Sequence, residues 1–159
     1  MKWYINIGQR FNWNDIDEKA LDEHVEVEYK KFLGNKWDPR SPELIKYNTK
    51  CGLAAEYYLV QHHGYKRHGK KYEDVHNEEN IHVEVKSKSV NGNVKEEIKK
   101  ELEKLRYRKL KGKHIAEHVI FFTRDKEEYE CNSFWSWNEI SKEYECQDNI
   151  NVQLDAFMV

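Results

Sequence analysis

The sequence predicts an α/β fold in which a mixed central β-sheet is flanked by helices. Residues 72–89 are typical of a β-hairpin, because a polar turn at 77–80 separates a short strand from a run that alternates apolar and polar residues. Residues 119–122, Val-Ile-Phe-Phe, predict a strand buried on both faces at the centre of a sheet. Apolar residues at helical spacing before and after the hairpin predict the flanking helices.

The part of the chain before the hairpin predicts a strand and two helices. Residues 2–7 favour a short first strand, and the helix after it ends near Phe32. A second helix is expected to begin at Asn48 or Thr49, after a loop that contains both prolines, and to end near Gly64. This second helix is apolar almost all round, which indicates that it is buried.

The remaining elements follow from the same kinds of pattern. Residues 65–71 predict a basic loop, and an amphipathic helix is expected from Val94 through Leu105. Residues 134–137 predict a further strand, followed by a short helix from Asn138. Residues 152–157 alternate and predict a last edge strand.

Length and composition limit the class of protein. A chain of 159 residues suits one domain spanning 1–159, and aromatic residues, at 13%, must supply much of its buried area. The net charge of −2 argues against a uniformly basic nucleic-acid binder, so any such binding must come from local patches. Three cysteines without close pairing, no signal-like apolar start and no apolar run of transmembrane length predict a cytoplasmic protein without a membrane partner.

The hairpin also predicts a cluster of charged residues. Alternation along residues 81–86 directs Glu84 and Lys86 to one face of the strand, and Asp74 on the neighbouring strand reaches the same place if the hairpin closes. Glu56 lies in the apolar second helix, where a carboxylate is costly unless it is paired or binds a cation. The alternative is that Glu84 and Lys86 pair across the sheet at its solvent face, and that Glu56 pairs with an arginine or lysine.

This order of residues resembles the PD-(D/E)XK nuclease superfamily, which has the restriction-endonuclease-like fold. In that superfamily an aspartate at the start of one strand precedes an acid-x-Lys motif on the next, and a helix before them carries another acid. Here these positions are Asp74, Glu84-Val85-Lys86, and Glu56 in the run CGLAAEYYLV. A glutamate replaces the proline that gives the superfamily its name.

The resemblance covers residues 50–124 most clearly and implies a Mg²⁺-dependent DNA endonuclease, from a phage or a restriction system. It implies that the carboxylates of Asp74 and Glu84 and the carbonyl of Val85 hold Mg²⁺, with Mn²⁺ as a substitute. Glu56 would hold a second ion or a metal-bound water. Lys86 would orient or deprotonate the attacking water. Cleavage of both strands of a duplex would favour a homodimer. The alternative function is a non-catalytic nucleic-acid-binding or interaction protein with the same fold.

Two basic runs flank these residues in the sequence and predict contacts with the DNA backbone. Together with a lysine on the hairpin, the predicted contacts are Lys66, Arg67, Lys70, Lys71, Lys88, Lys104, Arg106, Arg108, Lys109, Lys111 and Lys113. The alternative is that these runs are solvated faces, and that part of the second run caps a helix C-terminus.

A second motif predicts different chemistry. Residues 114–118, His-Ile-Ala-Glu-His, match the H-x-x-E-H pattern of zinc proteases. Zinc binding through His114 and His118 requires that both lie on one face of a helix. Gly112 just before them and the strand-like run just after them argue against that helix.

Overall fold

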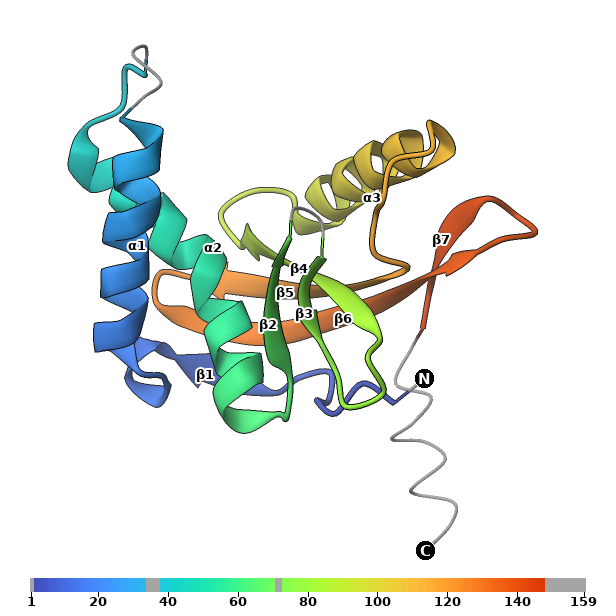
Figure 1. Cartoon of the computed structure of the whole chain (residues 1–159), viewed down its shortest axis with the longest axis horizontal. Helices are drawn as coiled ribbons and strands as arrows, with labels where there is room; N and C mark the ends of the chain where they lie inside the picture. Colours follow the sequence, from blue (N-terminus) through green and yellow to red (C-terminus); the bar gives the residue numbers. More distant parts are fainter. Residues whose placement is uncertain (1, 34–37, 71–72, 148–159) are drawn as a thin grey trace, which may run out of the picture.

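The computed structural model describes residues 2–33, 38–70 and 73–147, with the backbone alone at 68–70 and 73. It has a mixed, curled β-sheet with helices on both faces (Figure 1). The helical elements are η1 (Trp13–Asp15), α1 (Glu18–Phe32), α2 (Pro42–His62) and α3 (Val94–Leu110). The strands are β1 (Arg10–Asn12), β2 (Lys66–Lys70), β3 (Glu73–His76), β4 (His82–Ser89), β5 (His118–Asp125), β6 (Glu128–Asn138) and β7 (Glu143–Cys146).

The strand order in the sheet is β1-β6-β5-β4-β3-β2, and β7 also pairs with β6. Strands β2, β3 and β4 form an antiparallel meander, whereas β4 and β5 run parallel and are connected through α3. A parallel pair needs such a crossover because a tight turn cannot join strands that point the same way. The prediction of a mixed sheet flanked by helices is therefore confirmed.

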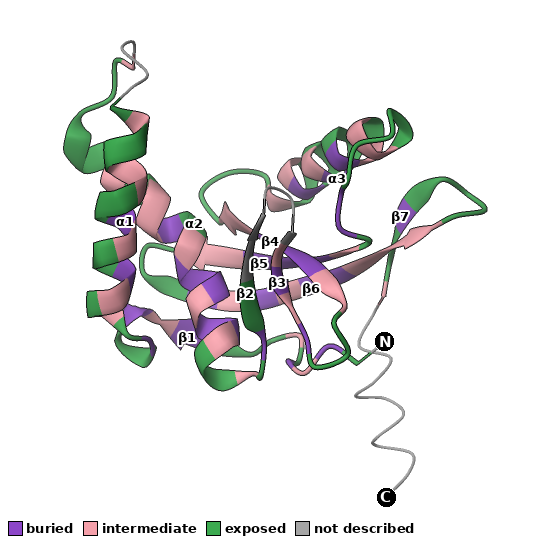
Figure 2. Cartoon of the chain, viewed as in Figure 1, coloured by how far each residue is buried: buried purple, intermediate pink, exposed green. Residues whose placement is uncertain are grey.

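Strand β5 is buried on both faces, as predicted. Ile120 and Phe122 belong to a large core together with residues of α1 and α2, and Val119 and Phe121 pack against α3. All four side chains are fully buried. Figure 2 shows that buried segments concentrate in the central strands and on the inward sides of the helices.

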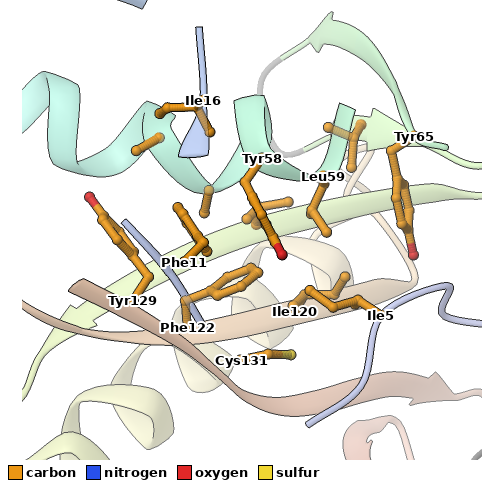
Figure 3. Close-up of a cluster of buried hydrophobic side chains, with 14 of the residues drawn as sticks. Ile5, Phe11, Ile16, Tyr58, Leu59, Tyr65, Ile120, Phe122, Tyr129 and Cys131 are labelled. Atoms are coloured by element: carbon orange, nitrogen blue, oxygen red, sulfur yellow. The ribbon is translucent and has the colours of Figure 1, made fainter. Parts of the chain in front are cut away.

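The large core depends on aromatic stacking, as the composition predicts. Phe11 of β1 stacks between Tyr58 of α2, at 4.0 Å between ring centroids, and Tyr129 of β6, at 4.6 Å. Figure 3 shows these rings beside Phe122 of β5. The core under α3 is smaller and contains Ile98, Leu102 and Leu105 from one face of that helix. The α1–α2 side of the sheet thus carries most of the apolar packing.

The second helix begins earlier than the sequence predicted. α2 begins at Pro42 instead of Asn48 or Thr49, because the Ser41 side chain accepts a hydrogen bond from the Leu44 N–H and proline favours the first helical turn. The hydroxyl of Thr49 donates to the Ile45 carbonyl inside the helix and does not cap it.

The prediction of a strand at residues 2–7 was wrong. Tyr4 has a φ of +62°, which interrupts an extended chain, and the first strand is β1. Trp3 and Ile5 are nevertheless buried, and Trp3 stacks on Phe134 at 4.6 Å. The alternating pattern therefore reflects side-chain packing without backbone pairing.

Two further predictions after the second helix need correction. Most of the expected basic loop at 65–71 forms β2, an edge strand that pairs with β3. Asn138 does not begin a helix, because its side chain accepts hydrogen bonds from the N–H groups of Ile140 and Ser141 and forms the turn into β7. The expected edge strand at 152–157 lies outside the described residues.

Candidate active site

The hairpin closes as the sequence predicted, and Asn77 fixes its turn. Asn77 is buried, and its side-chain oxygen accepts hydrogen bonds from the N–H groups of Glu79 and Ile81 at 3.0 Å. The strands then pair with Val75 opposite Val83. Continuing this register by one residue sets Asp74 opposite Glu84, on the face of the sheet that Val83 does not use.

Asp74 and Glu84 form a hydrogen-bonded pair of carboxyl groups. Protonated Glu84 donates to Asp74, and Oδ2 of Asp74 also accepts from the backbone N–H of Val85 at 2.8 Å. Glu84 is only 2% exposed, and no residue that the structure describes bonds its Oε2 atom. Burial, followed by the hydrogen bond and charge of Asp74, raises the pKa of Glu84 to about 10, against the opposing charge of Lys86.

Glu56 lies on α2 and is buried as well, at 5% exposure. Burial and then the charge of Asp74 raise its pKa to about 8, whereas the charges of Arg67 and Lys86 oppose this rise. The Nε atom of Arg67 lies 3.8 Å from Oε1 of Glu56. This ion pair favours the alternative that Glu56 is paired with an arginine.

The four predicted residues therefore influence one another, but they do not form one ligand cluster. Glu84 contacts Asp74, and both Glu56 and Glu84 respond to the charges of Asp74 and Lys86. Within residues 2–33, 38–70 and 73–147, however, no three His, Cys, Asp or Glu side chains lie together as ligands of one ion. The structure thus brings Asp74 and Glu84 together and does not add Glu56 to them as a third ligand.

The carboxyl pair nevertheless suits a hard cation. Mg²⁺ in enzymes is usually held by one or two carboxylates, with water and substrate phosphate completing its shell. Asp74 and Glu84 supply that number of carboxylates, and the unbonded buried oxygen of Glu84 is costly without a donor or a cation. The carbonyl of Val85 remains a predicted ligand.

Lys86 and Lys88 follow Glu84 on the same face of β4. Lys86 is half-buried, and its charge acts on both Glu56 and Glu84. Lys88 forms an ion pair with Glu101 of α3, at 2.9 Å between Nζ and Oε1. Glu101 is not among the residues predicted from the sequence, where its only signal is its place beside the apolar stripe of α3.

Several of the predicted phosphate contacts already serve the fold. The guanidinium of Arg67 lies over the ring of Tyr57. Arg106 donates a hydrogen bond to the carbonyl of Lys142 at 2.8 Å, and Lys109 donates one to the carbonyl of Ile115 at 3.3 Å. The predicted contacts that are exposed are Lys66, Arg67, Lys104, Lys111 and Lys113, and of these Arg67 also lies 3.8 Å from Glu56. Arg108 is half-buried, the side chain of Lys70 is not described, and Lys71 lies outside the described residues.

The H-x-x-E-H motif does not lie on a helix. His114 is in the loop after α3, and His118 begins β5. Nδ1 of His118 lies 2.7 Å from the hydroxyl of Ser136, and burial lowers the pKa of this histidine. The two side chains therefore lack the shared helical face that the zinc-protease arrangement requires.

Comparison with known protein families, curated sequences and solved structures finds no match. The resemblance to PD-(D/E)XK nucleases therefore rests on the residues named above. Among the helices that the structure describes, none is both long enough and apolar enough to cross a membrane.

Proposed function

We propose that this protein is a metal-dependent endonuclease that hydrolyses phosphodiester bonds in DNA. The observation that carries the proposal is the pair formed by buried Glu84 and half-buried Asp74, with Lys86 on the same face as Glu84. Two adjacent acids are costly in the interior unless a proton or a cation offsets their charge. A lysine beside them adds a group that can handle a proton or stabilise a phosphate.

The proposal assigns metal binding, orientation of water and binding of phosphates to different residues. Asp74 and Glu84 would hold Mg²⁺, which supplies an activated water and a counter-charge for the phosphate. Lys86 orients the attacking water and offsets the negative charge that develops on the phosphate oxygens. Glu56, whose pKa is raised to about 8, is not assigned to this pair and lies 3.8 Å from Arg67. The exposed lysines near the end of α3, Lys104, Lys111 and Lys113, supply affinity without sequence preference.

Nicking of supercoiled plasmid DNA tests this proposal. The parent protein should nick DNA in Mg²⁺ or Mn²⁺ and not in chelator, and Glu84→Gln should abolish nicking. Glu97→Gln is the matched control, because it removes an equal charge from a residue of α3 outside the proposed site. Binding without cleavage by the parent would favour the non-catalytic alternative, and the absence of both would reject both functions.

A further inference from the structure

Glu101 of α3 is influenced by three lysines. Lys88 donates to its Oε1 atom at 2.9 Å, and the side chains of this pair are only 18% and 17% exposed. Burial opposes ionisation of Glu101, but the hydrogen bond from Lys88 and the charges of Lys86 and Lys104 outweigh it and lower the pKa. Glu101 is therefore ionised at neutral pH.

These lysines come from two elements that meet at the proposed site. Lys86 and Lys88 lie on the face of β4 that carries Glu84, about 7 Å apart by the strand repeat. Lys104 lies on α3, one turn after Glu101. Like charges at such distances repel one another, so long side chains without a central anion would move apart into solvent.

A carboxylate among the lysines offsets that repulsion and still leaves donors for a ligand. An ammonium group has three N–H donors, of which Glu101 accepts one from Lys88. The other two can bind phosphate oxygens. Holding a lysine before the ligand arrives also reduces the side-chain entropy that is lost on binding.

We propose that Glu101 is a positioning residue for phosphate recognition, which holds Lys88 by a hydrogen bond and attracts Lys104 by its charge, so that both lie near Lys86. The DNA backbone then contacts one fixed lysine, Lys88, and two further cations whose mutual repulsion Glu101 reduces. This inference rests on the proposed function and deepens it, because it assigns the phosphates next to the cleaved bond to Lys88 and Lys104.

The test compares Glu101→Gln with Glu97→Gln, since both remove one negative charge from α3 and only the first contacts Lys88. Steady-state cleavage in Mg²⁺ gives kcat and KM, binding in Ca²⁺ at several salt concentrations gives Kd and the salt slope, and melting temperatures establish that each variant folds. Relative to Glu97→Gln, we expect Glu101→Gln to lose about tenfold in kcat/KM, or about 1.4 kcal/mol. Its salt slope should fall by about one contact, and Glu101→Asp should recover part of the loss.

The outcomes separate three cases. Kinetics and salt slope equal to those of Glu97→Gln, with only a lower melting temperature, would mean that the ion pair is purely structural. Tighter binding than Glu97→Gln would mean that Glu101 competes with phosphate. Either result overturns the inference and leaves the proposed function intact, whereas a parent that neither binds nor cuts DNA rejects the function and the inference together.

Discussion

The two faces of β4 are equally well buried at their centre and differ in what covers them. Val83 and Val85 are 0% and 4% exposed and belong to the large core with α2. Glu84, between them in the sequence, is 2% exposed, contacts Asp74 and precedes Lys86 on the same face of the strand. Burial alone therefore does not indicate the role of a residue, because one face contributes apolar packing and the other holds charges that oppose folding.

The largest expected difference between the two faces is in catalysis. Lys86→Ala should lower kcat by roughly 10²–10⁴-fold, the usual contribution of a proton-handling group, and should barely change the melting temperature. Val83→Ala changes the other face and should leave kcat within about threefold while it lowers stability. Steady-state nicking assays and calorimetry on both variants measure this contrast. Full activity of Lys86→Ala would remove Lys86 from the mechanism.

The second expected difference is in how stability depends on pH. Burial and the charge of Asp74 raise the pKa of Glu56 from its ordinary value of 4.5 to about 8 in the folded protein. Between these values the folded state keeps a proton that the unfolded state has lost, so stability decreases as pH rises through this window. Below about pH 4.5 both states are protonated, and the difference disappears.

Glu56→Gln removes this titration at nearly constant shape. In chelator, the free energy of unfolding of Glu56→Gln relative to the parent should increase by about 2 kcal/mol between pH 6 and pH 8. The slope is about 1.36 kcal/mol per pH unit and becomes smaller near pH 8, where the folded protein itself begins to lose the proton. Urea unfolding at the two pH values measures the change. An advantage that is the same at both pH values would show that Glu56 ionises normally when folded.

Substitutions on the two faces of β4 should change stability in different ways. Val83 is fully buried between α2 and the sheet, and Val83→Ala should destabilise the protein by about 2 kcal/mol through lost burial and a small cavity. Glu84→Gln should not destabilise the protein in chelator, because it removes a buried acid beside Asp74. Mg²⁺ should then stabilise the parent more than Glu84→Gln, by mass action. Calorimetry with and without Mg²⁺ would contradict this expectation if both proteins gained equally.

The smallest expected effect concerns the basic residues of α3 and its following loop. Replacing the exposed pair Lys104 and Lys113 by alanine should weaken DNA binding equally for all sequences and lower the salt slope by roughly one per lost contact. Arg106→Ala should instead lower stability, because it removes a hydrogen bond to the β6–β7 turn. A salt titration of binding for both variants distinguishes the two roles.

The sequence by itself determined much of the central architecture. Alternation in β4 indicates a strand with charged residues on one face and apolar residues on the other. The continuous apolar run in β5 indicates a strand that is buried on both faces. The hairpin turn and the start of α3 also follow from local sequence, because the Asn77 side chain closes the turn and the Asn93 side chain caps the helix through residues a few positions away. The closeness of Asp74 and Glu84 followed from that turn.

Only the tertiary structure decided the partners of the charged residues. Arg67 reaches Glu56 and Lys88 reaches Glu101 from separate elements, and no local pattern encodes which acid a long side chain will meet. The same holds for β2, whose polar sequence becomes a strand because β3 supplies its hydrogen bonds. Local rules thus set the elements and faces of this protein, whereas the electrostatics of the candidate site depend on how distant elements pack together.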